Sequence, residues 1–197
     1  WLFSATMPPE VNRIAKKFMN NPQEITVGTK NSSAKNIEHQ YFIVPGRERY
    51  AALRAVVSMN TDIFGVVFCR TKIETQKVAD KLIQDGYKAA AIHGDLSQNQ
   101  RDIVMQSFRK KKIQLLVATD VAARGIDVDD ITHVINYQLP DETEVYTHRS
   151  GRTGRAGKKG TSNIFVTTSD RRKIKSIENK LQTKLSEIQM PSAEEVF

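Results

Sequence analysis

The sequence is poor in cysteine, in aromatic residues and in long hydrophobic runs. Cys69 is its one cysteine in 197 residues, so the chain can form neither an internal disulfide nor a cysteine-based zinc site. It lies in the apolar run 65–69, which predicts a buried thiol in a reducing compartment. No apolar run approaches the roughly 20 residues that span a bilayer, and no signal-peptide pattern opens the chain. These absences favour a cytoplasmic protein.

Several motifs of nucleotide and metal sites are also missing. The sequence contains no Gly-x-x-x-x-Gly-Lys-Ser/Thr phosphate loop and no Asp-Glu-Ala-Asp. A near match at 151–157 has five residues between its glycines where four are needed, and Lys158 is followed by another lysine. The carboxylates at 127, 129 and 130 lack the glycine and terminal glutamate of a calcium loop. We predict no metal site and no complete ATPase site.

Charge is the most pronounced feature of the composition. Lysine and arginine total 30 against 22 aspartate and glutamate, which gives a net charge of +8 and a pI near 9.6. Such a balance favours a polyanionic partner such as nucleic acid. On charge alone, an anionic membrane surface fits equally well.

Apolar runs alternate with amphipathic segments along most of the chain. The pattern predicts strands at 40–44, 63–69, 88–92, 113–118, 133–136 and 161–166, and helices at 47–59, 72–84, 98–108, 142–148 and 170–185. This alternation predicts an α/β fold with a mostly parallel central sheet and helices on both faces.

The ends of the chain differ from this regular centre. Residues 1–28 predict a short helix at 11–19 and a strand at 24–27, which would be the tail of a preceding domain. Residues 29–36 are small and polar and predict a linker. The main domain is expected at 37–185 and a tail at 186–197. The missing initiator methionine suggests an excised piece of a longer protein.

Ligands of open α/β sheets bind beyond the carboxyl ends of the strands, so four polar segments expected there are candidate sites. The most specific is His148–Gly157, in which arginines alternate with glycines. Guanidinium groups are suited to phosphate oxygens. A merely solvated basic loop is the alternative, but it does not explain glycines at every third residue from 151 to 160.

The second segment, Ala118–Asp127, combines a hydroxyl, an arginine, a glycine and two carboxylates. Asp127 could accept a hydrogen bond from a ribose hydroxyl. Alternatively, Asp120 caps the next short helix and Asp127 belongs to a turn.

The third and fourth segments also precede predicted helices. At His93–Arg101, a backbone amide at Gly94 could donate to a phosphate, although Asp95 or Ser97 could simply be an N-cap. At Phe68–Lys72, a basic residue and the hydroxyl of Thr71 stand ahead of a helix whose N-terminus attracts phosphate. Capping by Thr71 is the alternative there.

Read in order, the four segments resemble the helicase motifs of the second RecA-like domain of DEAD-box RNA helicases. Ser4-Ala5-Thr6, followed by Met7-Pro8, resembles the coupling motif at the end of that family's first domain. The resemblance covers all but about the last dozen residues. It implies a RecA-like three-layer fold and an ATP-dependent RNA helicase, with a bacterial cold-shock or ribosome-assembly type fitting by overall similarity.

The resemblance also implies roles for individual residues. Arg152 and Arg155 would be arginine fingers that reach the γ-phosphate of ATP, and Asp127 would bind the ribose, with Gly125 beside it. Contacts to the RNA backbone, without sequence preference, would come from Thr71, Gly94, Gln98, Arg101, Thr119, Arg124 and Gly125. Ser4, Thr6 and His148 would couple the sites. ATP and Mg²⁺ would be held mainly by the N-terminal RecA-like domain, so this chain alone should not turn over ATP.

Two other functions compete with this interpretation. One is an RNA-binding or docking module that never engages a nucleotide. The other is a DNA helicase of the wider superfamily, because loops that track a backbone do not by themselves distinguish ribose from deoxyribose. The residues at 148–155 favour the RNA family.

Overall fold

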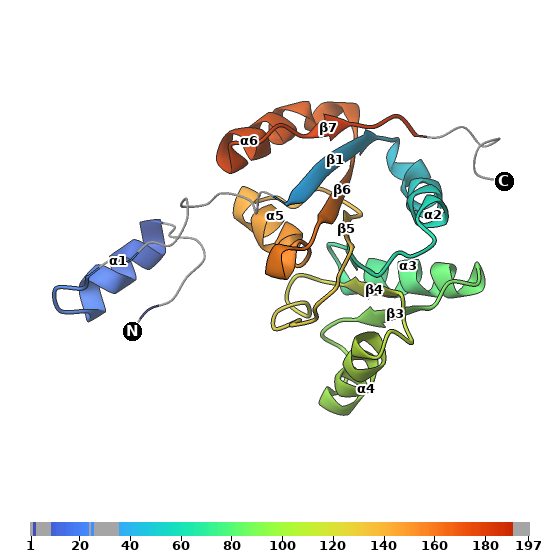
Figure 1. Ribbon diagram of the computed structural model, residues 1–197, viewed down its shortest axis with the longest axis horizontal. Helices are drawn as coiled ribbons and strands as arrows, with labels where there is room; N and C mark the ends of the chain where they lie inside the picture. Colours follow the sequence, from blue (N-terminus) through green and yellow to red (C-terminus); the bar gives the residue numbers. More distant parts are fainter. Residues whose placement is uncertain (1, 3–8, 24, 26–35, 191–197) are drawn as a thin grey trace.

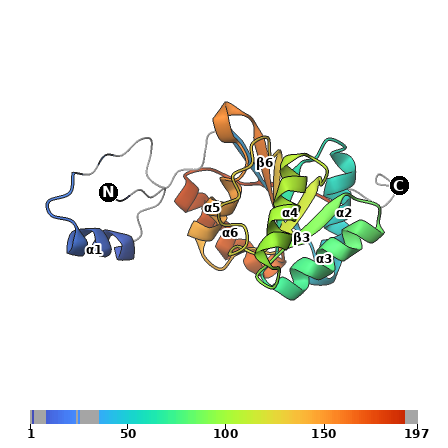
Figure 2. The same ribbon diagram turned by 90° about the horizontal axis from the view of Figure 1, so that it is seen from below.

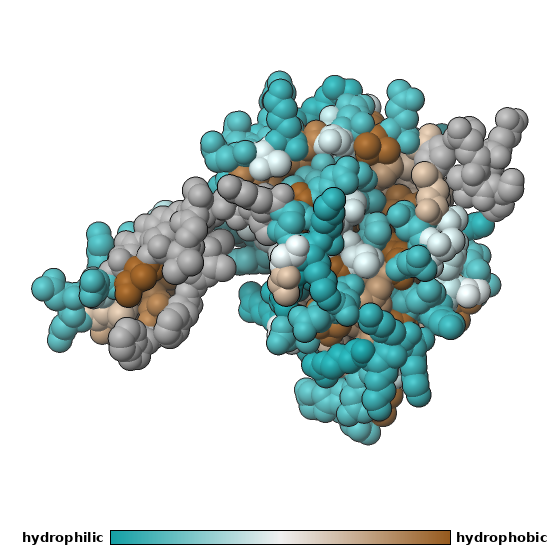
Figure 3. Space-filling view, viewed as in Figure 1, coloured by the Kyte–Doolittle hydropathy of each residue, from teal (hydrophilic) through white to brown (hydrophobic). Residues whose placement is uncertain are grey.

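The computed structural model describes residues 2, 9–23, 25 and 36–190. Helix α1 (Pro9–Phe18) confirms the helix expected near the N-terminus and leaves Ile14 and Phe18 exposed. Most of the predicted strand at 24–27 lies outside the described residues, as do Ser4, Thr6 and most of the predicted linker. Figure 3 shows a mostly hydrophilic surface on this side of the molecule, with apolar atoms visible on α1.

A seven-stranded sheet forms the centre of the molecule, in the order β3-β4-β2-β5-β6-β1-β7 (Figure 1). Every strand pair in it is parallel, which confirms the predicted sheet type. The strands are β1 (Ile37–Ile43), β2 (Gly65–Phe68), β3 (Ala89–Ile92), β4 (Leu115–Ala118), β5 (His133–Asn136), β6 (Gly160–Val166) and β7 (Ser186–Glu187).

Helices cover both faces of this sheet, as Figures 1 and 2 show from two directions. Helices α2 (Arg49–Met59) and α3 (Lys72–Gln84) bury Leu53 and Leu82 against one face. On the other face, α4 (Gln98–Arg109) buries Phe108, while α5 (Thr143–Ser150) and α6 (Arg171–Leu181) bury Tyr146 and Ile174. Short 3₁₀ turns lie at Gly46–Glu48, Arg155–Gly157 and Thr168–Asp170. The predicted three-layer architecture is confirmed.

The largest difference from the predicted elements lies near the C-terminus. The helix expected at 170–185 ends at Leu181, because Gln182 adopts a left-handed conformation with φ of 53°. Leu185 is buried all the same, and its amide donates to the Glu178 side chain at 2.9 Å. The apolar spacing therefore continues past the true helix end. The chain then pairs with β1 as β7, within the segment that the sequence predicted to be a tail.

A buried polar chain crosses from the sheet to α5. The Nδ1 atom of His39 lies 2.6 Å from the Tyr146 hydroxyl, which lies 3.1 Å from the Ser162 hydroxyl. His39 is 3% exposed, and this burial lowers its pKa from 6.5 to about 4, because desolvation disfavours the charged ring. Folding therefore favours the neutral imidazole at this position.

This preference predicts a specific pH dependence of stability. Above pH 6.5 His39 is neutral in the folded and unfolded chain, whereas between pH 6.5 and about 4 only the unfolded chain takes up the proton. Wild type should lose up to about 3 kcal/mol relative to His39→Gln across that window. Urea unfolding of both proteins at several pH values measures the difference. Parallel stability curves would show that burial does not depress this pKa.

Candidate functional site

The loops that follow β2 and β3 are organised by helix caps and one ion pair. The Thr71 side chain accepts a hydrogen bond from the amide of Glu74 at 3.2 Å, so it caps α3. Ser97 caps α4 in a capping box with Gln100. Asp95 is not the cap: it pairs with Lys72 at 2.8 Å, and the hydrogen bond from this lysine lowers the pKa of the carboxyl group. The capping alternatives for Thr71 and Ser97 are therefore confirmed.

The loop that follows β4 is joined to α4. The guanidinium of Arg101 donates to the carbonyl of Ala122 at 3.3 Å, and the Thr119 hydroxyl accepts from the Ala122 amide at 3.4 Å. Gln98 instead donates to Asp102 along the exposed side of α4. Because β3, β4 and β2 are neighbours in the sheet, their carboxyl ends place Thr71, Thr119 and the 93–101 segment along one edge.

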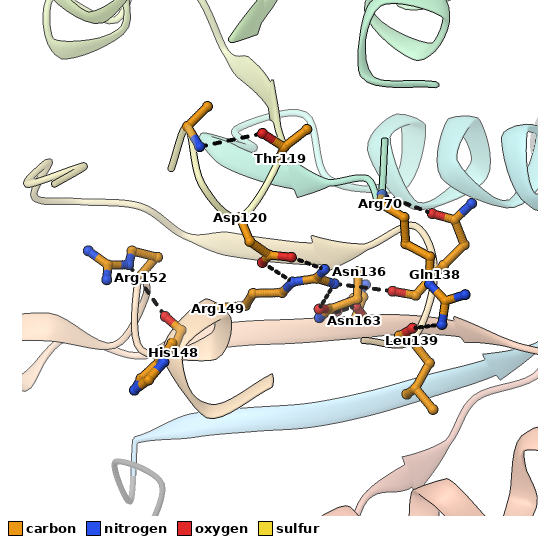
Figure 4. A network of polar contacts seen from close by, with 11 residues as sticks. Arg70, Thr119, Asp120, Asn136, Gln138, Leu139, His148, Arg149, Arg152 and Asn163 are labelled. Atoms are coloured by element: carbon orange, nitrogen blue, oxygen red, sulfur yellow. Dashed lines mark hydrogen bonds and ion pairs between the residues drawn. The ribbon is translucent and has the colours of Figure 1, made fainter. Parts of the chain in front are cut away.

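A buried arginine that sequence reasoning left without a role holds this edge together. The Arg149 side chain is 2% exposed and forms two bonds with Asp120, at 2.6 and 2.7 Å. It also donates to the Asn136 side chain and the Gln138 carbonyl, and its guanidinium lies 5.1 Å from the Phe68 ring centre. Figure 4 shows Asp120, Asn136 and Gln138 around the Arg149 guanidinium.

The Arg149 contacts correct the expectation for Asp120. Asp120 does not cap the following turn, since Thr119 does so, and its carboxylate serves as the partner of a buried cation. One signal in the sequence could have indicated this pairing. Asp120 follows the apolar strand β4, and Asn136 is the last residue of β5, so both side-chain oxygens lie at the rim of the core and need a buried donor.

The arginine-rich segment does not lie where the sequence placed it. The Thr153 hydroxyl donates to the carbonyls of Ile131 and Thr132, just before β5 begins, and the segment leads directly into β6. Residues 151–157 therefore lie at the amino edge of the sheet, opposite the carboxyl-end loops. The prediction went wrong because this segment follows a helix and precedes a strand.

Two of the arginines meet the far end of the loop that follows β4. Arg152 donates to the Ile126 carbonyl at 3.0 Å and to the His148 carbonyl at 3.4 Å. Arg155 pairs with Asp127 at 2.7 Å and donates to the Gly151 carbonyl at 3.2 Å. Of the four residues expected to face the nucleotide, Arg155 and Asp127 form an ion pair, and Arg152 binds the adjacent Ile126 carbonyl, one residue after Gly125. Partial burial, together with the positive charge of Arg155, lowers the pKa of Arg152.

The exposure of this cluster differs from that of Arg149. The Asp127 side chain is 88% exposed, and that of Arg155 is 30% exposed. Gly125 precedes them with φ of 77° and open space around its Cα. The 124–127 turn therefore presents its polar groups to solvent, next to two cations.

The regularly spaced glycines meet two structural requirements, which are close packing against the sheet and a positive φ. At Gly154, φ is 67° and an added Cβ would lie 2.6 Å from the Ile37 side chain; at Gly160, a Cβ would overlap the Thr153 hydroxyl. These two glycines permit close packing of the segment on the sheet. Gly157, in contrast, faces open space with φ of 77°.

The described residues offer no metal site of their own. Within that part of the chain, no group of three or more His, Cys, Asp or Glu side chains could hold a metal ion. Among the same residues, no helix is long and apolar enough to span a membrane.

An open, all-parallel sheet with polar loops at its strand ends defines an α/β domain of the kind that binds nucleotides or nucleic acids. Comparison with known proteins gives the family. Residues 48–157, more than half of the chain, match the model of the helicase conserved C-terminal domain. The chain belongs to this family, as the C-terminal helicase domain of a DEAD-box RNA helicase similar to CshA.

Individual relatives agree with this placement. The chain is 41% identical to the DEAD-box ATP-dependent RNA helicase CshA of Bacillus cereus and 39% identical to that of Bacillus subtilis, over 100% of this chain. It spans 37% and 40% of those proteins, about two fifths of their length.

Solved structures share the fold. A DEAD box protein from Methanococcus jannaschii is 46% identical, with a TM-score of 0.74 over 94% of this chain and 50% of its own. S. cerevisiae Dbp5 bound to RNA and ADP BeF3 is 28% identical, with a TM-score of 0.89 over 98% of this chain and 52% of its own. The RecA-like fold class is thereby confirmed.

The Arg149–Asp120 and Arg155–Asp127 ion pairs should contribute differently to the free energy of unfolding. Asp120→Asn leaves the buried Arg149 without its counter-charge and should lower the free energy of unfolding by about 2 kcal/mol. Asp127→Asn removes an exposed pair and should cost less than about 1 kcal/mol. Urea denaturation of the two matched variants tests this difference. Equal losses would contradict the structural role given to Arg149.

Proposed function

We propose that this chain is the half of an ATP-dependent RNA helicase that supplies arginine fingers and a surface for the RNA backbone. A companion N-terminal RecA-like domain would hold most of the ATP together with Mg²⁺. The main support for this proposal is the loop 119–127. It has a candidate RNA contact, Thr119, at one end and a candidate nucleotide contact, Asp127, at the other. Arg149 and Arg152, three residues apart, hold those two ends.

The nucleotide side of the proposal rests on Arg152, Arg155 and Asp127. In phosphoryl transfer, charge spreads over the oxygens of the transferred group, and guanidinium groups stabilise that charge. Asp127 would accept from the ATP ribose, beside Gly125. Arg155 and Asp127 now bind one another, so ATP would replace their ion pair. Because the pair is exposed, it is worth only about 0–1 kcal/mol, and the exchange is inexpensive.

The RNA side uses groups along the carboxyl edge of the sheet, together with Arg124 and Gly125 in the turn that ends at Asp127. Backbone contacts would come from one set of loop and helix residues: Thr71, Gly94, Gln98, Arg101, Thr119, Arg124 and Gly125. The main chain at Gly94 is unobstructed, since an added Cβ would meet nothing within 4 Å. Such contacts read phosphate and sugar groups, which explains binding without sequence preference. The structure of S. cerevisiae Dbp5 bound to RNA, which shares this fold, supports this assignment.

Coupling between the two sides follows from shared segments. ATP and RNA would each bridge this domain and its companion, so binding of both favours a closed state, and hydrolysis removes that preference. His148 lies at the end of α5, between Thr147 and the buried Arg149, and its carbonyl binds the Arg152 guanidinium. Ser4 and Thr6 would act from the first-domain side. In the cell we expect a cytoplasmic protein.

Magnesium and the phosphate grip belong to the companion domain in this proposal. The chain has no Walker-type loop, and its described residues provide no three-ligand acidic or histidine cluster. The isolated chain should therefore not hydrolyse ATP.

The finger assignment predicts a separation of turnover from binding. In a DEAD-box protein that joins this chain to an ATP-gripping domain, Arg152→Ala or Arg155→Ala should lower RNA-stimulated turnover by about 10³-fold or more. ATP affinity should change only a few-fold, because the companion domain supplies most contacts. Arg172→Ala, on α6, is the matched control. Unchanged turnover in both finger variants would refute the assignment.

The backbone-contact surface predicts weak, salt-sensitive binding by the chain alone. Its affinity for single-stranded RNA should fall linearly on a log–log plot against salt, by about 0.7 per neutralised phosphate. Gln98→Ala with Arg101→Ala should weaken binding equally for oligonucleotides of different base composition. Fluorescence anisotropy measures both effects. Tight, salt-independent or sequence-selective binding would contradict the proposal.

A further inference from the structure

A groove runs along the outer edge of the sheet, between α3 and the end of β3. Its volume is about 590 Å³, and its walls come from α3 together with His93 and Asp95. Strand β3 pairs only with β4 in the sheet, so this groove lies at the exposed sheet edge. None of its α3 residues beyond Lys72 belongs to the four segments described from the sequence.

The charges in this groove leave lysines available to a ligand. Of its two carboxylates, Asp95 pairs with Lys72 at 2.8 Å, whereas Asp80 accepts from the neutral Gln76 amide at 2.7 Å and keeps its negative charge. The Lys77 side chain is exposed, and no ion pair or hydrogen bond joins it to another described side chain. Lys81 lies one turn further on, with its ammonium 4.9 Å from the Tyr50 ring centre. The groove therefore carries a small excess of positive charge, with three lysines against two carboxylates.

A fixed polar group closes one end of the groove. His93 is 7% exposed, and its Nε2 lies 3.0 Å from the Gln76 side-chain oxygen. Because the Gln76 amide nitrogen donates to Asp80, the oxygen must face the histidine, so Nε2 carries the proton. The wall formed by Asp80, Gln76 and His93 is thus connected by hydrogen bonds and held in one orientation.

The groove is continuous with the proposed RNA surface. Gly94, a proposed phosphate contact, lies between the groove residues His93 and Asp95, and Thr71 immediately precedes Lys72. Lys72 and Lys81 are nine positions apart, which corresponds to about 14 Å along the helix. Lys77 and Lys81, four residues apart, lie on the same side of α3 and would meet a chain that leaves the Gly94 loop along the helix.

From this placement we propose that the α3 groove is an additional RNA subsite, which binds the sugar-phosphate backbone of nucleotides extending past the Gly94 loop. Lys77 and Lys81 are its phosphate contacts, and the His93–Gln76–Asp80 wall is its fixed side. The proposal rests on the RNA surface proposed above. The groove lengthens the stretch of RNA that this domain contacts, so that a short RNA would not reach Lys77 and Lys81.

The test is a length series of oligouridylates, extended one nucleotide at a time at either end and bound to this chain at several salt concentrations. The test variant is Lys77→Gln with Lys81→Gln. Arg172→Gln with Lys175→Gln is the matched control, because it removes two exposed charges from α6 on the other face of the sheet. Gln98→Ala with Arg101→Ala reports on the proposed RNA surface itself.

For long RNA, the groove variant should reduce the log–log salt slope by about 1.4, which is two phosphates at about 0.7 each. For the shortest RNA that binds, its slope should equal that of wild type, as should the control's slope at every length. A loss that is independent of length, or equal to that of the α6 control, overturns the groove. If Gln98→Ala with Arg101→Ala leaves all binding unchanged, the proposed RNA surface fails as well.

Discussion

The bidentate contact between Arg149 and Asp120 is the interaction on which the rest of the site depends. It joins the end of α5 to the loop that follows β4, beneath the carboxyl edge of the sheet. A buried guanidinium is tolerated only when its donors are satisfied, and here a carboxylate, an amide oxygen and a backbone carbonyl satisfy them. Its position is therefore fixed, and it fixes the two segments that meet there.

Those two segments connect opposite edges of the sheet. From Asp120 the loop continues to Asp127, and from Arg149 the chain continues to Arg152 and Arg155, which meet the same loop again. The Arg149–Asp120 contact is fixed by a buried guanidinium, whereas the Arg155–Asp127 ion pair is exposed and can be exchanged. This difference suits the proposed function, in which the proposed RNA surface stays organised while the proposed nucleotide contacts change partners.

Sequence reasoning recovered the elements whose local signals agree with their packing. Helix 72–84 and strand 133–136 were predicted at their observed bounds, and the parallel three-layer architecture followed from the alternation of patterns. Long-range geometry was not recoverable in the same way. The end of α6 was hidden because Leu185 continues its apolar spacing after a left-handed residue. The edge on which the arginines lie depends on where Thr153 binds, which no local pattern shows.

The residues of the candidate site likewise fall into those predicted from the sequence and those found only in the structure. Arg152, Arg155 and Asp127 were singled out from motif resemblance, and the structure pairs Arg155 with Asp127 and binds Arg152 to the adjacent Ile126 carbonyl. The contacts of Arg149 became visible only in the structure. The most direct test is a structure of a DEAD-box protein containing this chain, bound to RNA and a nucleotide phosphate analogue. The account predicts Asp127 separated from Arg155, both arginines at the analogue, and the Arg149–Asp120 contact unchanged. Arginines still bound to Ile126 and Asp127, away from the phosphates, would contradict it.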